Sequence, residues 1–292
     1  MMADYDLHLH TCWSYDATGD VGYYVRRAAQ RGLRCIAIAE HHVLDSWAEV
    51  QAAAKAHPGL RVVRSAELSV TTAIGSVDLL CYGFPLELPA AMQQVLDRYH
   101  DWQRQYGAGM VRGMQRLGLA YSEEDRRALL ESYRPARTLA VQGLTHVGNT
   151  TLMRHFMAKG LVKSQQEYGE LLGQLRSMGE LPPYPPAEEV VPHVLASGAI
   201  IALAHPTGYV QTDSDRIDSL RSQCCFDGIE CAHPSIPDQA SLFYREYCRR
   251  NGMFSTGGSD SHSNEDVDAG LADHGGQPEW LDEFLARLEA VQ

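Results

Sequence analysis

The sequence predicts an α/β protein in which seven strands close most of a barrel. Short apolar runs rich in β-branched residues alternate with amphipathic helical patterns, which is typical of parallel strands joined by right-handed crossover helices. Seven such runs are present, enough for a barrel rather than a small open sheet. With 292 residues, 45% of them hydrophobic, the chain can also form a large core and a lesser domain.

The expected strands are Tyr5–His10, Leu33–Glu40, Arg61–Ser69, Val77–Phe84, Ala199–His205, Gly228–Cys231 and Met253–Ser259. The expected helices between them have apolar residues at i, i+3 and i+4 spacing. They are Asp20–Arg31, Ser46–His57, Pro186–Ser197, Pro237–Asn251 and Pro278–Val291. Asp20 is the expected N-cap of the first helix, because a short acidic side chain there can accept from free backbone N–H groups.

The middle of the chain has a different character. From about residue 85 to 186 the strand signal disappears, and long helical stretches cover Pro89–Leu117 and Leu152–Met178. Residues 181–186, which read LPPYPP, are expected to form a rigid extended linker. We therefore expect residues 1–84 and 187–292 to form the barrel domain, with residues 85–186 as a helical insertion over its mouth.

Composition restricts the partners and the location. The net charge of −12 argues against a long nucleic-acid partner, although bound cations could still make one pocket attractive to a small anion. No run of about 18 apolar residues is present, so no membrane span is expected. The start of the chain has no secretory pattern, and the seven cysteines show no CxxC spacing. These observations favour a cytoplasmic location and leave the oligomeric state open.

Residues of the metal-ligand type recur where the expected strands end. His8 and His10, in the stretch DLHLHT, lie two positions apart and therefore face the same side of the first strand. This pair alone fits a metal site and an ordinary polar strand face equally well. Later strands end in AEHH, SAEL, AHP and GGSDSH. Because C-terminal strand ends converge in β/α barrels and a buried charge needs a partner, the set favours a metal centre.

Taken in order, these motifs together with SYDA and GIECAHPS resemble those of the PHP (polymerase and histidinol phosphatase) family. The resemblance covers roughly residues 1–84 and 199–292. It implies a distorted (β/α)7 barrel that holds two or three divalent ions and, most often, phosphoesterase activity. It also implies the ligands: His8, His10, Glu67 and Asp260 for one ion, Asp16, His41 and His262 for another, and Glu67 with His205 for a third.

Three further residues, Asp78, Glu40 and His42, lie within or beside these motifs. Where family members often have a histidine in the fourth strand, this chain has VDLLCY, and Asp78 is the favoured replacement ligand; the alternative is a cap on the preceding turn. Glu40 occupies the acidic position before His41 and is a catalytic candidate that either supports His41 or lies near the ions. His42 is expected at the rim.

Substrate-facing residues are predicted from weaker signals. Arg154 and His155 resemble an Arg-His pair of PHP phosphatases that act on nucleotide 3′,5′-bisphosphates, and an arginine can bind phosphate through two hydrogen bonds. An exposed helix face explains them equally well. The upstream R-x-H of those enzymes reads NTT here, which leaves His146 as a replacement candidate. His233 is expected to contact the phosphate or the leaving group, whereas Glu230 suits a structural role equally well.

Imidazole and carboxylate ligands without thiolates suit Mn²⁺, Zn²⁺ or Fe²⁺. Two such ions can share a hydroxide and bind phosphoryl oxygens, so a metal-bridging hydroxide is the expected nucleophile. The expected substrate is a small phosphorylated metabolite, either a phosphomonoester or a cyclic phosphodiester of a nucleotide or sugar. The alternatives are a nucleotide 3′,5′-bisphosphate phosphatase, a histidinol-phosphatase-like enzyme, an amidohydrolase-type C–N hydrolase and a catalytically decayed metal-binding module.

Overall fold

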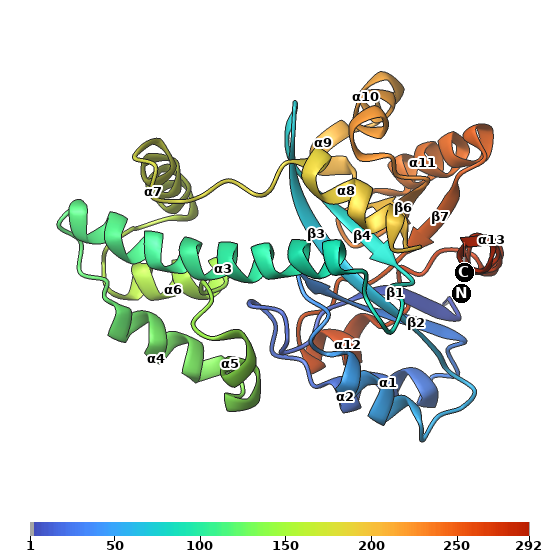
Figure 1. The fold of residues 1–292 in the computed structure, drawn as a ribbon, viewed down its shortest axis with the longest axis horizontal. Helices are drawn as coiled ribbons and strands as arrows, with labels where there is room; N and C mark the ends of the chain where they lie inside the picture. Colours follow the sequence, from blue (N-terminus) through green and yellow to red (C-terminus); the bar gives the residue numbers. More distant parts are fainter. Residues whose placement is uncertain (1–2, 292) are drawn as a thin grey trace.

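The computed structural model describes residues 3–291 and contains a seven-stranded sheet whose strands pair in chain order (Figure 1). The strands are β1 (Tyr5–Leu9), β2 (Cys35–His41), β3 (Arg61–Thr72), β4 (Gly75–Tyr82), β5 (Ile200–Leu203), β6 (Gly228–Ala232) and β7 (Phe254–Gly257). After β7 the chain returns to β1, where the backbone N–H of His10 donates to the carbonyl of Ser261 at 2.9 Å. The sheet is thus nearly closed, which confirms the distorted barrel.

One strand runs against the predicted direction. The alternation of strands and helices predicts parallel pairing throughout, yet β4 is antiparallel to both β3 and β5, while the other pairs are parallel. The cause is a tight hairpin in which Thr72 pairs with Gly75, leaving too few residues for a crossover helix. As a result the start of β4 lies beside the end of β3, where Asp78 pairs with Ser69.

Most helices pack on the barrel. They are α1 (Val21–Gln30), α2 (Trp47–Ala54), α8 (Ala187–Ala196), α9 (Thr207–Val210), α10 (Ser214–Cys224), α11 (Asp238–Asn251), α12 (Asn264–Gly270) and α13 (Pro278–Val291). The N-cap of α1 is confirmed, since Asp20 accepts from the backbone N–H of Tyr23 at 2.7 Å. The sequence patterns did not predict α9, α10 or α12.

Five further helices form the part of the molecule that extends away from the barrel (Figure 1). They are α3 (Ala90–Arg116), α4 (Glu123–Tyr133), α5 (Ala136–Gln142), α6 (Asn149–Ala158) and α7 (Gln165–Ser177). The expected helix Leu152–Met178 is divided in two, because Gly160 adopts a φ of 71° after α6 and Ser164 caps α7. These helices enclose a hydrophobic core distinct from the barrel core.

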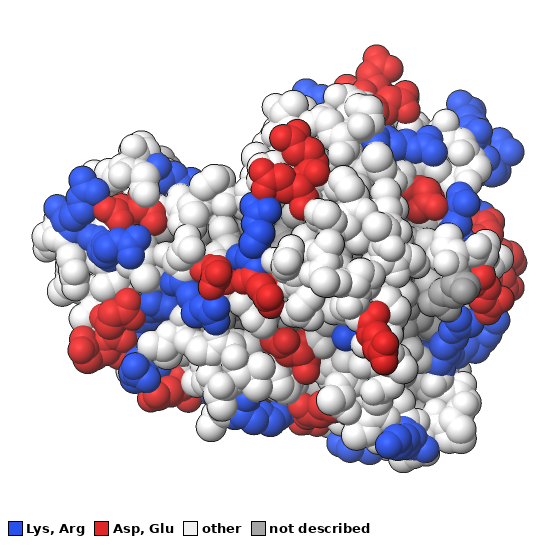
Figure 2. Space-filling model, viewed as in Figure 1, with Lys and Arg blue, Asp and Glu red and all other residues white. Residues whose placement is uncertain are grey.

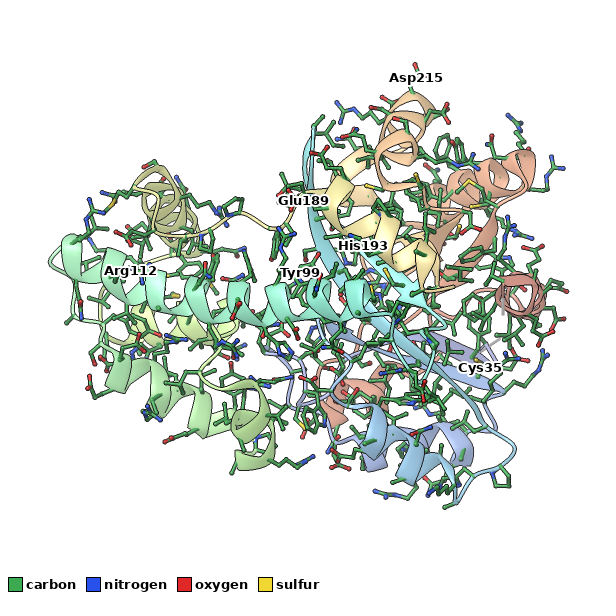
Figure 3. The ribbon with its side chains drawn as sticks, viewed as in Figure 1. Cys35, Tyr99, Arg112, Glu189, His193 and Asp215 are labelled. Atoms are coloured by element: carbon green, nitrogen blue, oxygen red, sulfur yellow. The ribbon has the colours of Figure 1, made fainter. Side chains whose placement is uncertain are left out.

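Helix α3 connects the two cores. Tyr99 lies on the half of α3 near β3, where its hydroxyl donates to the carbonyl of Ser69 at 2.7 Å, whereas Arg112 lies on the distant half (Figure 3). Trp102 donates to the carbonyl of Pro183 in the linker at 2.8 Å. The division of the chain into a barrel domain and an insertion at residues 85–186 stays a prediction.

None of the helices within residues 3–291 combines the length and the apolarity needed to span a membrane. On the face shown in Figure 2, acidic and basic side chains are interspersed over both the barrel and the helical part. The visible surface therefore carries charges of both signs rather than a single-sign stripe.

Candidate metal centre

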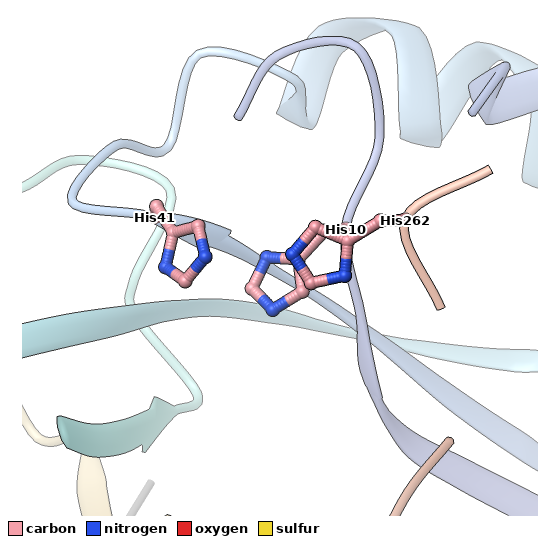
Figure 4. Close-up of side chains that lie close together, drawn as sticks. All are labelled: His10, His41 and His262. Atoms are coloured by element: carbon pink, nitrogen blue, oxygen red, sulfur yellow. The ribbon is translucent and has the colours of Figure 1, made fainter. Parts of the chain in front are cut away.

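The strand ends bring imidazoles and carboxylates into one cluster. Figure 4 shows three of the imidazoles, from the segment after β1, the end of β2 and the segment after β7. Within residues 3–291 the groups with suitably close ligand atoms are His10, His41 and His262; His8, His233 and Asp260; His8, His10 and Glu67; and Glu67, Asp78 and His205. Because these groups share members, the cluster is continuous.

The first ion position lies between β1, β3 and the segment after β7. Nε2 of His8 lies 3.3 Å from Oε2 of Glu67 and 3.4 Å from Oδ1 of Asp260. Nε2 of His10 lies 3.3 and 3.1 Å from the same two oxygens, yet it makes no hydrogen bond within the described residues. Ligands about 2.0–2.1 Å from a tetrahedral metal lie about 3.3 Å from one another. Each of these four nitrogen-to-oxygen distances therefore matches the spacing of ligands around one metal ion.

Neighbouring groups fix which nitrogen these two imidazoles direct inward. Nδ1 of His8 lies 2.9 Å from Oε1 of Glu230, so it carries the proton. The hydroxyl of Ser14 donates to Glu40 at 2.6 Å, so its oxygen accepts from Nδ1 of His10 at 3.3 Å. Nε2 is thus the nitrogen of each ring that is available to a metal, an orientation that the partners of metal-binding histidines usually ensure.

This geometry gives Glu40 a positioning role. Its carboxylate is fully buried and accepts from the backbone N–H of Thr11 at 3.0 Å as well as from both hydroxyls, those of Thr11 and Ser14. Because these bonds occupy both oxygens, Glu40 acts on His10 through Ser14, and its catalytic role stays a prediction. Ser14 was missed by sequence reasoning; only its place two residues before Asp16 could have indicated it.

A second position lies between Asp16, His41 and His262. Oδ2 of Asp16 lies 3.4 Å from Nε2 of His41 and 3.8 Å from Nε2 of His262. Nδ1 of His262 donates to the backbone carbonyl of Asp260 at 2.8 Å, which leaves its Nε2 free. Among residues 3–291 the buried Nδ1 of His41 makes no hydrogen bond, although Oε2 of Glu67 lies 3.1 Å away. These unsatisfied atoms also fit a cation.

The third position uses the other oxygen of Glu67. Oε1 lies 2.9 Å from Nε2 of His205, and Oδ2 of Asp78 lies 3.9 Å from the same nitrogen. Asp78 reaches this place because β4 is antiparallel and starts at the barrel mouth. Its oxygens accept from Ser69 and Tyr209, each at 2.5 Å, so it does not cap the preceding turn. Glu67 can therefore bridge two ion positions.

His233 comes close to the first position but is oriented differently. The backbone N–H of Ser235 donates to Nδ1 of His233 at 3.0 Å, so the neutral ring must carry its proton on Nε2. Nε2 lies 3.3 Å from Oδ2 of Asp260 and donates to it. With the proton on Nε2, His233 presents an N–H to Asp260 at the edge of the cluster, and its contact with the phosphate or the leaving group stays a prediction.

The backbone around the cluster is strained and closely held. His205 and Asp260 have positive φ values of 25° and 53°, which is unusual for residues other than glycine. Oε2 of Glu230 accepts from the backbone N–H of His205 at 2.7 Å. Asp6, whose role the sequence did not reveal, accepts from the N–H of Ser259 at 3.1 Å and ties the turn before Asp260 to β1.

The electrostatics of the cluster favour cations. Burial alone would lower the pKa of His8, yet the surrounding carboxylates, Glu230 foremost, raise it well above its ordinary value. Burial opposes the charged form of Glu67 in turn, and the imidazoles of His8 and His41 nevertheless hold its pKa well below the usual range. Carboxylates that stabilise protons so strongly will also stabilise divalent ions. The residues of the cluster therefore fit the divalent ions that the sequence motifs imply.

Three sequence candidates lie elsewhere. Arg154 is exposed on α6, and His155 packs its ring against Tyr121 and Phe156 at centroid distances of 6.1 Å; no contact joins the pair to the cluster among the described residues. His42 is fully buried instead of lying at the rim, because α3 covers it.

His146 is also buried, and it lies beside the loop that carries Asp16. Its ring centroid is 3.8 Å from that of Tyr15, and burial lowers its pKa to about 3. A residue of the helical part thus packs directly beside the loop that forms the second ion position. His146 packs against this loop as a neutral ring.

The fold and the cluster define a barrel whose strand ends bring together groups of metal-ligand side chains. The PHP domain model matches residues 6–179, more than half of the chain, and the chain belongs to the PHP family. No curated protein gives a significant match to the sequence. The resemblance that the motifs indicated is confirmed.

Two solved structures are similar over nearly the whole chain. A provisionally assigned metal-dependent phosphoesterase from Bifidobacterium adolescentis has 21% identity and a TM-score of 0.70, covering 97% of this chain and 96% of its own. An amidohydrolase from Chromobacterium violaceum with bound sulfate and no metal has 21% identity and a TM-score of 0.71, covering 99% and 97%. At this identity the likeness establishes a common fold.

Proposed function

We propose that the protein is a metal-dependent hydrolase of phosphate esters that acts on a small phosphorylated metabolite. The observation that carries the proposal is the carboxylate of Glu67, whose Oε2 faces the imidazoles of the first two positions while Oε1 faces His205. A carboxylate shared in this way suits neighbouring divalent ions, and Mn²⁺, Zn²⁺ or Fe²⁺ suit the ligand types. Such ions, when bound, supply Lewis acidity toward phosphoryl oxygens and water.

The chain's own groups then perform the remaining tasks. Asp260 and Asp16, partly exposed at 26% and 24%, lie where a substrate can enter. His233 holds a proton on Nε2 at the edge of the first position and is placed to give it to the leaving oxygen. The barrel core behind Glu67, which is only 1% exposed, excludes bulk water from the inner side.

The substrate class remains part of the proposal. A phosphomonoester or a cyclic phosphodiester of a nucleotide or sugar fits a site at the barrel mouth where the candidate metal ligands Asp260 and Asp16 are partly exposed. The 3′,5′-bisphosphate alternative loses support, because Arg154 and His155 do not contact the cluster within residues 3–291.

The test compares p-nitrophenyl phosphate, bis-p-nitrophenyl phosphate and p-nitroacetanilide with protein whose metal content has been measured. Metal-dependent release of p-nitrophenolate from either phosphate supports the proposal, and a preference for the diester favours the cyclic substrate. Cleavage of the anilide without cleavage of either phosphate would instead support a C–N hydrolase, the activity class of the Chromobacterium neighbour.

A further inference from the structure

Two groups of the third ion position share one hydroxyl. The hydroxyl of Tyr209 lies 2.5 Å from Oδ2 of Asp78 and 3.2 Å from Nδ1 of His205. An ionised carboxylate only accepts, so the hydroxyl must give its single hydrogen to Asp78. Its oxygen can then only accept from Nδ1 of His205. This fixes a proton on Nδ1 of His205. Nε2, which donates to Oε1 of Glu67 at 2.9 Å, is therefore the nitrogen that can bind a metal once its proton leaves.

The other oxygen of Asp78 is fixed by a second directional chain. Ser69 must donate to Oδ1 of Asp78, at 2.5 Å, for the same reason. The oxygen of Ser69 therefore accepts from Nε2 of His42 at 2.9 Å, and Nδ1 of His42 accepts from the side-chain amide of Gln103 at 3.4 Å. Every hydrogen bond from Gln103 to Asp78 thus has one allowed direction.

Helix α3 holds the far end of this chain. The ring of Tyr99 stacks on His42 with centroids 4.9 Å apart and planes inclined by 4°. Gln103 donates to the carbonyl of His41 at 3.2 Å as well, and it is only 2% exposed. His42 keeps a positive φ of 67° in this environment. Helix α3 therefore contacts the ring of this strained residue through Tyr99 and its Nδ1 through Gln103.

We propose that Tyr209 and Ser69 are positioning residues that select the metal-binding forms of His205 and Asp78. The inference rests on the proposed function only in requiring that the cluster binds divalent ions. Removal of either hydroxyl frees the carboxylate of Asp78 to rotate, and removal of the Tyr209 hydroxyl also allows the wrong tautomer of His205. Such partners typically change metal affinity by about 10–100-fold.

The experiment measures Mn²⁺ per chain in protein purified with this ion, followed by stepwise removal with a chelator. The variants are Tyr209→Phe and Ser69→Ala. Tyr23→Phe is the matched control, because it removes an equivalent hydroxyl-to-carboxylate bond, of 2.7 Å to Asp268, from the surface. Circular dichroism and thermal unfolding establish that each variant is folded.

We expect three ions per chain in the wild type and in Tyr23→Phe, with one ion lost at about 10–100-fold lower chelator concentration in both other variants. The remaining ions should leave at unchanged concentrations, which a general loss of structure would not produce. Only two ions in the wild type, or unchanged release in folded Tyr209→Phe and Ser69→Ala, would overturn the inference. Because no substrate is involved, the result is independent of whether phosphate esters are cleaved.

Discussion

At the scale of single residues, the centre depends on which nitrogen each imidazole presents. Nδ1 is occupied by a carboxylate, hydroxyl or backbone oxygen in His8, His10, His205 and His262, so Nε2 faces the cluster in all four. His233 has the reverse arrangement, because a backbone N–H donates to its Nδ1. The partner of Nδ1 thus separates these four candidate ligands from the candidate proton donor, although all five are histidines close to the same carboxylates.

This distinction predicts how leaving groups respond to His233→Ala. A general acid typically contributes about 10²–10⁴-fold when the leaving group needs a proton. We expect turnover of phenyl phosphate to fall about a hundredfold or more, with a fall of less than about tenfold for p-nitrophenyl phosphate, whose leaving group is a weaker base. Steady-state rates on both substrates check this prediction. Equal losses on the two would assign His233 a role other than proton donation.

The buried ring of His146 predicts a dependence of stability on pH. Its pKa is lowered to about 3 by burial, whereas an unfolded histidine titrates near 6.5. Below about pH 6.5 the unfolded chain therefore binds a proton that the folded chain does not, and stability decreases by about 1.4 kcal/mol per pH unit toward pH 3. In urea unfolding between pH 7.5 and 5, His146→Phe should lose less stability than the wild type. Parallel pH profiles would contradict this.

At the scale of elements, the sheet directions explain what the sequence could and could not reveal. The motifs indicated the strand ends that carry His8, His41, Glu67 and His205 because side-chain alternation and apolar runs are local properties. The direction of β4 depends on a short hairpin, and only the pairing shows that it brings Asp78 to the mouth.

The other differences between the predicted and the observed site also come from tertiary contacts. His42 was expected at the rim because the local sequence says nothing about α3, which packs on it. The roles of Ser14 and His233 rest on hydrogen-bond directions, which depend on partners from other segments or on loop geometry. Arg154 matched a short motif, but its helix directs it to solvent.

The helical part also holds the loop that carries Asp16. The hydroxyl of Tyr133, at the end of α4, donates to the carbonyl of Tyr15 at 2.5 Å and accepts from the N–H of Gly148 at 3.2 Å. Tyr133→Phe should lower the free energy of unfolding by about 1–3 kcal/mol, because it leaves these buried groups without a partner. Urea unfolding measures this, with the surface variant Tyr23→Phe as control. A loss no larger than that of the control would show that the contact is unimportant.

At the scale of the whole molecule, the cluster joins segments that are distant in sequence. Its candidate ligands come from positions 8 to 262, so an ion bound among them connects the two ends of the chain around the nearly closed sheet. Within the described residues, Nε2 of His10, Nδ1 of His41 and Oδ1 of Asp16 are buried without a hydrogen-bond partner. Ion binding should therefore contribute to the stability of the barrel itself.

Removal of the ions tests this contribution. An ion present at about a hundred times its Kd stabilises the folded state by about 2.7 kcal/mol. A strong chelator should therefore lower Tm by about 5 °C or more, and added Mn²⁺ should restore it. Differential scanning calorimetry in both conditions provides the measurement. An identical Tm with and without ions would indicate that the cluster binds none tightly.

The most direct test of the central claim, a metal-dependent phosphoesterase centre, combines metal content and turnover in His8→Ala/Asp260→Ala. The matched control is His193→Ala/Asp215→Ala, whose residues lie on α8 and α10 outside the cluster (Figure 3). We predict that the first variant loses at least one ion per chain. Its hydrolysis of p-nitrophenyl or bis-p-nitrophenyl phosphate should fall at least about a thousandfold, while the control keeps both properties. Full metal content and full activity in the first variant would contradict the account.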